Sequence, residues 1–175
     1  ILTVPNLLVL ILRLRTLVNC PRVLNIDIIS AKEKALEELI ELTAPQSLIV
    51  FFEFTQTLNK INEKFHAPVI SGEISQNERQ KILTDFKQKK NRLLFATAAA
   101  GEGLNLQEAQ DVVHYELPYT HSRVEQRIGR IYRHGQELPC RSWKIIVKDS
   151  IDERLEKIIA KKKRLNVENL IKFLE

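Results

Sequence analysis

The 175-residue sequence predicts an α/β domain with a mainly parallel sheet that helices cover on both faces. Short apolar runs alternate along the chain with longer segments of helical periodicity, which is typical of strand–helix–strand units. The most apolar of these runs, residues 47–52, is continuous, as expected of a strand buried on both faces. Because ligands of such sheets bind at the carboxyl ends of strands, we expect functional residues there.

The elements follow from local signals along the chain. Helices are expected over residues 7–18, 31–42, 55–64, 75–90, 121–133 and 150–174. Strands are expected over residues 47–52, 68–70, 93–96, 109–115 and 142–147. Pro21 favours a loop over residues 19–29, and Pro45 should end the second helix. Ser30 is expected to cap that helix, with Glu33 at the capping-box position.

The chain length suits one domain with flanking segments. We expect an N-terminal helical extension over residues 1–29, a core lobe over 30–149 and a C-terminal helical segment over 150–175. The first helix should be mostly buried, and its apolar run, residues 7–12, is too short to cross a bilayer. The chain begins with Ile1 instead of Met, so we expect a piece of a longer protein. Two cysteines without metal-like spacing indicate a reducing, intracellular location, in the cytoplasm, nucleoid or nucleus.

Positive charge concentrates in the last third of the chain. Residues 123–164 hold 13 Lys and Arg against six Asp and Glu, whereas the rest of the chain holds 14 against 16. A basic stretch attracts phosphate on a nucleotide or a nucleic acid. Composition alone would equally fit a solvated helical face.

The most informative segment is Q-R-I-G-R-I-Y-R, residues 126–133. On a helix, Gln126, Arg130 and Arg133 would share one face at i, i+4 and i+7. Gly129 beside them would allow a close backbone approach. Arginine binds phosphate oxygens through a planar fork and keeps its charge, so two arginines on one face suit a triphosphate. Two surface arginines without function are the competing interpretation, and this spacing argues against it.

These residues resemble motif VI of superfamily 2 helicases, and the R-H-G-Q segment that follows, residues 133–136, resembles the ending found in the Swi/Snf branch. The stretch A-T-A-A-A-G-E-G-L-N-L, residues 96–106, comes after an expected strand and resembles motif V of the same family. A small-residue loop in this place can offer backbone N–H groups to phosphates. The two motifs lie about 29 residues apart, which strengthens both matches.

Further segments fall into the family's order, so the resemblance covers about residues 7–170. They are L-R to P at 12–21, S-A-K at 30–32, L-I-V-F-F-E-F-T at 48–55, S-G at 71–72 and S-I-D-E-R at 150–154. E-L-P at 116–118 and E-Q-R at 125–127 look closer to the bacterial RapA-like group. His134 and Tyr119 to His121 depart from the usual family residues.

The resemblance implies a RecA-like lobe and a role for particular residues. It makes Arg130 and Arg133 catalytic contacts of the γ-phosphate. The nucleotide would also be contacted by Gly101, Gly103, Asn105 and Gln126. The nucleic-acid backbone would be contacted by Ser71, Gly72, Thr97 and Ala98.

The chain has neither a G-x-x-x-x-G-K-[ST] loop nor an acidic D-E-x-H box. The family holds ATP and Mg²⁺ with those motifs on a first lobe, so we expect that lobe upstream in the same polypeptide. The partners implied are this first lobe and double-stranded DNA, with no membrane. The intact protein would be a DNA-dependent ATPase, whereas this fragment alone should be inactive.

Two other functions stay open. One is a lobe of an RNA or single-strand helicase, against which the segments at 133–136 and 150–154 argue. The other is a non-catalytic DNA-binding or scaffold module, against which the two arginines argue. His114 is expected to be a core histidine, and the remaining histidines lack ligand spacing, so no metal site is predicted.

Overall fold

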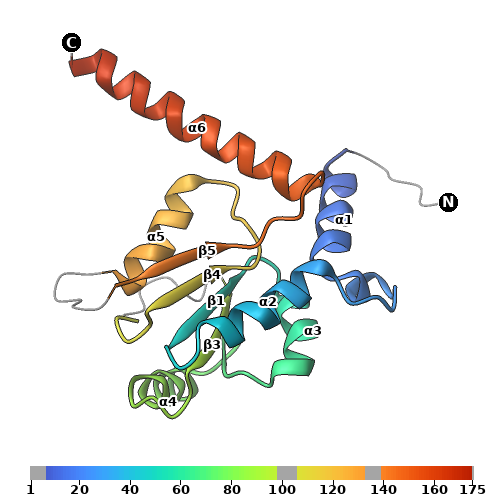
Figure 1. The fold of residues 1–175 in the computed structure, drawn as a ribbon, viewed down its shortest axis with the longest axis vertical. Helices are drawn as coiled ribbons and strands as arrows, with labels where there is room; N and C mark the ends of the chain where they lie inside the picture. The colour runs from blue at the N-terminus through green and yellow to red at the C-terminus, as the bar shows by residue number, and fades with distance from the viewer. Residues whose placement is uncertain (1–6, 98–105, 133–138, 175) are drawn as a thin grey trace.

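The computed structural model describes residues 7–97, 106–132 and 139–174, with side chains of the last helix described up to Lys162. A single five-stranded sheet lies at its centre, with helices around it (Figure 1). In chain order the elements are α1 (Leu7–Asn19), η1 (Pro21–Leu24), α2 (Ala31–Leu42), β1 (Leu48–Phe52), α3 (Thr55–Phe65), β2 (Val69–Ile70), α4 (Gln76–Lys87), β3 (Leu93–Thr97), β4 (Asp111–His114), α5 (His121–Ile131), β5 (Arg141–Lys144) and α6 (Ile151–Leu174).

The strand order is β2-β3-β1-β4-β5, and every neighbouring pair is parallel. β1 lies in the middle, where Phe52 pairs in register with Thr97 of β3, and Phe51 with His114 of β4. All five residues of β1 are buried, as the continuous apolar run predicted. The expected α/β architecture with a parallel sheet is therefore confirmed.

Alternate residues of β1 enter two separate cores. Leu48, Val50 and Phe52 pack with buried residues of α2 and α3, whereas Ile49 and Phe51 pack with α4 and α5. Because both faces of the sheet are covered, its functional surface is left to the strand ends and to the exposed faces of the helices.

Several boundaries differ from the sequence expectation. α4 ends at Lys87 because Lys89 adopts a left-handed backbone with φ of 56°. β4 begins at Asp111, since Ala109 instead closes a turn by donating its N–H to the carbonyl of Leu106 at 3.0 Å. β5 covers residues 141–144, earlier and shorter than expected. Within the expected loop, η1 forms one short helical turn.

The N-terminal helix α1 is less buried than expected. It packs against η1, α2 and α6, but Leu10, Leu14 and Leu17 on its other side are exposed. Only one side of the helix has a partner among the described residues, and this explains the difference. No helix in the described part of the chain is long and apolar enough to cross a membrane.

Helix α6 begins beside the sheet and extends away from it (Figure 1). Its first turns contact α1 and α5, and Leu155 and Ile159 pack with Leu117 in a small third core. Both flanking helices are thus attached to the lobe close to the end of β4.

Candidate functional site

Ser71, Gly72 and Thr97 lie at the ends of neighbouring strands and together form what we call the strand-end site. Ile70 of β2 pairs with Ala96 of β3, so the next residues, Ser71 and Thr97, end their parallel strands at the same edge of the sheet. Each of these two residues is only 6% exposed. Gly72 is exposed, and nothing lies within 4 Å of the position that a Cβ would take.

The turn after β2 is held locally. Glu73 donates its backbone N–H to Ser71 Oγ at 3.3 Å, and the Ser75 side chain caps α4 by accepting the Glu78 N–H at 3.2 Å. The strand-end site therefore offers hydroxyl groups and an open glycine backbone, which can contact phosphates without reading bases. Ala98, predicted to contact nucleic acid, lies outside the described residues.

Helix α5 separates a buried stripe from an open face. Val124, Arg127 and Ile131 form the buried stripe. Gln126 is exposed and Arg130 half-buried next to this stripe, at the predicted four-residue spacing. Among the described residues the Arg130 side chain has no hydrogen-bond or ion-pair partner.

Two further observations concern the surroundings of Arg130. Its carbonyl accepts the backbone N–H of Leu106 at 3.0 Å, which places α5 beside the segment that follows the predicted motif V loop. A Cβ at Gly129 would meet nothing within 4 Å, so the space predicted for a close approach is open.

The remaining predicted nucleotide contacts, Gly101, Gly103, Asn105 and Arg133, lie outside the described residues. The expectation of a continuous helix to residue 133 was wrong for its end. α5 stops at Ile131, and Tyr132 has an extended backbone with φ of −91° and ψ of 102°. Helical spacing therefore groups Gln126 with Arg130 but does not position Arg133.

Arg127 is a buried charge that sequence reasoning did not single out. Its guanidinium pairs with the Glu53 carboxylate just after β1 and donates to the Glu116 carbonyl at 3.3 Å. It also lies over the Phe51 ring, 5.2 Å from the ring centroid. This arginine attaches the buried side of α5 to the carboxyl ends of β1 and β4.

His114 completes the surroundings of Arg127. Arg127 Nη1 lies 3.4 Å from His114 Nδ1, and an arginine can only donate, so Nδ1 is the acceptor. The ring proton is then on Nε2, which donates to Ser142 Oγ at 3.2 Å. Burial, with Arg127 and Lys144 nearby, lowers the pKa of His114 from 6.5 to about 3. The histidine is neutral and part of the core, as expected.

Other buried polar side chains connect α1, α2 and α6 with the segment that follows β4. Lys32 Nζ donates to Asp152 Oδ2 at 2.7 Å and to Asn19 Oδ1 at 2.9 Å. Asn19 Nδ2 donates to Glu116 Oε1 at 2.8 Å. The other oxygen of Glu116 accepts the backbone N–H groups of residues 53 and 54 at 2.8 and 2.9 Å. Burial lowers the pKa of Lys32 and raises that of Glu116, and these contacts oppose both shifts.

We call these residues the buried charged cluster. It comprises Asn19, Lys32, Glu53, Glu116, Arg127 and Asp152. Its members come from α1, α2, α5, α6 and the segments that follow β1 and β4. The cluster connects the two flanking helices to the helix that carries Arg130.

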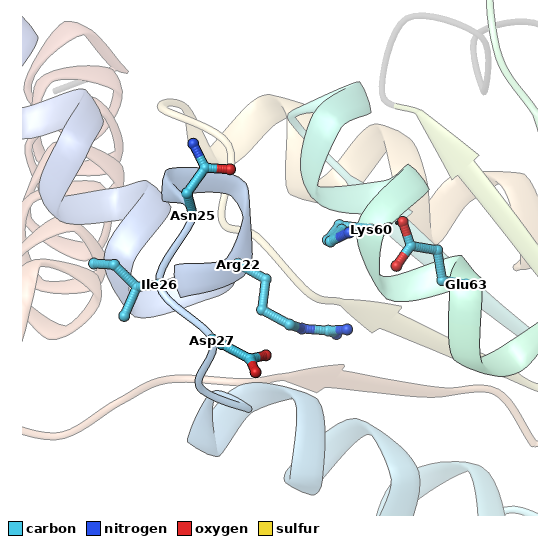
Figure 2. Close-up of a pocket in the computed structure, with 6 residues that line it drawn as sticks. All are labelled: Arg22, Asn25, Ile26, Asp27, Lys60 and Glu63. Carbon is cyan, nitrogen blue, oxygen red and sulfur yellow. Dashed lines mark hydrogen bonds and ion pairs between the residues drawn. The ribbon is translucent and has the colours of Figure 1, made fainter.

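A cavity of about 450 Å³ lies elsewhere, between the η1 turn and α3 (Figure 2). Arg22 extends from the η1 turn toward α3, which carries Lys60 and Glu63. These charges are already paired, Arg22 with Glu33 at 2.6 Å and Lys60 with Glu63 at 2.9 Å. The cavity contains none of the predicted site residues.

Comparisons with known proteins agree with this geometry. Residues 31–135 match the family model of the helicase conserved C-terminal domain. The chain is 30% identical to an uncharacterised ATP-dependent helicase of Mycoplasma pneumoniae, over 95% of the chain and 17% of that protein. It is 29% identical to the DNA repair protein RAD5B of Arabidopsis thaliana, over 89% of the chain and 14% of that protein. The chain thus spans less than a fifth of the length of these relatives.

Solved structures with the same fold include the C-terminal part of the Fun30 ATPase domain. That likeness has a TM-score of 0.67 at 24% identity and covers 74% of this chain and 45% of the other. The C-terminal domain of the DEAD-box protein Dbp5 gives a TM-score of 0.61 at 25% identity, over 75% of this chain and 77% of the other. The first likeness shows the fold, a RecA-like C-terminal lobe, and the second agrees with it.

Proposed function

The chain belongs to the helicase conserved C-terminal domain family, and from that premise we propose that it is the second motor lobe of a Swi/Snf-type ATPase that moves along double-stranded DNA. The observation that carries the proposal is the position of Arg130 on α5, where its backbone carbonyl bonds to Leu106 at the end of the predicted motif V loop and its side chain has no partner among the described residues. An arginine projected from a helix suits contact with a phosphoryl group.

ATP and Mg²⁺ would be held mainly by the first lobe. Among the described residues no group of three or more His, Cys, Asp or Glu side chains could hold a metal ion. Bound Mg²⁺ would neutralise charge on the transferring phosphoryl group. When the lobes close, Gln126 and Arg130 would reach the phosphates, with Arg133, Gly101, Gly103 and Asn105 as further proposed contacts. This fragment alone would therefore not hydrolyse ATP.

The strand-end site would contact the nucleic-acid backbone through Ser71, Gly72 and Thr97, together with Ala98. Opening and closing of the lobes would then move the protein along the duplex. The DNA repair relative supports DNA as the track. Since such enzymes act on nucleic acid inside the cell, we propose an intracellular location.

An RNA or single-strand helicase lobe is the second candidate. The likeness to the C-terminal domain of a DEAD-box protein supports it, and the strand-end site has no feature that distinguishes DNA from RNA. A non-catalytic module is less favoured, since Arg130 would have no phosphoryl group to contact there.

The test is ATP hydrolysis by the full-length protein with duplex DNA, single-stranded DNA, RNA or no nucleic acid. Duplex should stimulate hydrolysis most, and Arg130→Ala should reduce kcat by about 10³-fold, as for other arginines that contact the transferring phosphoryl group. Lys81→Ala, at an exposed position on α4, is the control and should behave as the unsubstituted protein. Strongest stimulation by RNA or single strands would favour the second candidate, and no hydrolysis in any condition would favour the non-catalytic module.

A further inference from the structure

We propose that Glu53 is a positioning residue for Arg130, acting through its ion pair with Arg127 on α5. This inference rests on the proposed function and adds to it a residue outside the nucleotide and nucleic-acid contacts assigned above. Glu53 itself is not placed at the nucleotide, so its effect on hydrolysis must be transmitted through the helix.

The first argument is the place of the pair on α5. Arg127 lies one turn before Arg130, as its i−3 neighbour, within the buried stripe that borders the half-buried Arg130. Because α5 is a rigid element, any shift or rotation at Arg127 moves the Arg130 guanidinium with it. The backbone carbonyl of Arg130 accepts the Leu106 N–H, so α5 has a second attachment near its C-terminal end.

The second argument is that Glu53 has few alternatives to this pairing. The side chains of Glu53 and Arg127 are 8% and 6% exposed, so neither charge can be solvated if the other is removed. Arg123, also on α5, reaches the second oxygen of Glu53 at 3.8 Å but is half-exposed. One carboxylate thus holds two arginines of the same helix.

The third argument is the support behind Glu53. The backbone N–H groups of Glu53 and Phe54 are both bonded to Glu116, which is in turn bonded to Asn19 of α1. Glu53 is therefore fixed in its backbone as well as in its side chain. A carboxylate fixed in this way can set the orientation of α5, whereas a mobile one could not.

The experiment compares Glu53→Gln with Glu37→Gln in the full-length protein. Both substitutions remove one negative charge, but Glu37 is in an exposed pair with Lys64 at 2.7 Å. We expect Glu53→Gln to lower kcat for nucleic-acid-stimulated ATP hydrolysis at least about tenfold with KM for ATP within about twofold, because misplaced catalytic groups lower the rate more than binding. Glu37→Gln should change neither constant by more than about twofold.

A loss of stability could imitate this result, so Leu36→Ala is the second control. Leu36 is buried in the core on the other face of the sheet, and its truncation should lower Tm without touching α5. If Leu36→Ala lowers kcat as much as Glu53→Gln at a comparable fall in Tm, or if Glu53→Gln keeps kcat within twofold, the inference is wrong.

Hydrogen exchange of the α5 amides gives a readout that does not need turnover. Glu53→Gln should speed exchange in α5 at least about tenfold, and Leu36→Ala should not do so selectively. Failure of the unsubstituted protein to hydrolyse ATP would count against the proposed function alone. Unchanged exchange in Glu53→Gln would count against the positioning role even if hydrolysis is strong.

Discussion

The strand-end site and the buried charged cluster are built in opposite ways. Ser71, Gly72 and Thr97 come together because parallel strands end at the same edge, so the backbone positions them. In the buried charged cluster, side chains from distant parts of the chain hold one another, as Lys32 and Asp152 do across 120 residues. The difference indicates that the proposed backbone-contact site depends on strand register alone, whereas α5, which carries the proposed catalytic Arg130, is held in place by paired charges.

The largest effect on stability should come from breaking the buried charged cluster at Lys32. Lys32→Met would leave Asp152 and the Asn19 amide oxygen without the Lys32 donor. The side chains of Lys32 and Asp152 are 0% and 1% exposed, so water cannot replace it. We expect a loss of about 3–5 kcal/mol in the free energy of unfolding. Urea unfolding of the 175-residue chain measures it.

Lys64→Met is the matched control, because Lys64 pairs with Glu37 in solvent at 40% and 43% exposure. Lys64→Met should lower the free energy of unfolding by less than about 1 kcal/mol. Equal costs for the two substitutions would mean that the buried charged cluster is no more important than a surface pair. Adding Asp152→Leu to Lys32→Met should recover part of the loss, since two apolar side chains avoid an unpaired charge.

A smaller, pH-dependent effect is expected at His114, which borders the cluster. Its pKa is lowered from 6.5 to about 3, so between these values the unfolded chain takes up a proton that the folded chain does not. Stability should therefore fall as the pH drops from about 6.5 toward 3, by at most about 1.4 kcal/mol per pH unit from this group. His114→Gln should remove that part of the slope, and an unchanged slope would show that other groups cause it.

The smallest effect is expected in the strand-end site. Thr97→Val keeps the shape of the side chain and removes its hydroxyl, so nucleic-acid affinity should fall by about fivefold, or ~1 kcal/mol. The fall should be equal for different base sequences, because backbone contacts carry no sequence information. Thr84→Val on α4, where the hydroxyl donates to the Gln80 carbonyl of its own helix at 2.8 Å, should leave binding unchanged. A sequence-dependent loss in Thr97→Val would contradict backbone contact.

The same contrast explains what could be predicted from the sequence. Periodicity and capping predicted the succession of strands and helices along the chain and most helix boundaries. They also predicted Ser30 as the cap that accepts the Glu33 N–H. The family motifs located the segment around residue 126, and the match over residues 31–135 confirms that family. The site residues themselves stay predictions.

Pairing between side chains far apart in the sequence could not be predicted. Nothing near Glu53 in the sequence indicates that it pairs with Arg127, 74 residues away. A charged residue on a helix, such as Arg127, ordinarily points to solvent. Nothing in the S-A-K segment indicates burial of Lys32, although its side chain is fully buried. The ends of α4 and β5 were also misplaced, because a left-handed residue such as Lys89 has no strong signal in a single sequence.

The ion pair between Glu53 and Arg127 also constrains how this chain can change over generations. A neutral residue at either position would leave the other charge buried and unpaired, so a single replacement passes through a weakened protein. Lineages that lose the carboxylate at position 53 should therefore also have lost the arginine at position 127. The two positions would be inherited as one character, although neither is assigned a direct contact with the nucleotide.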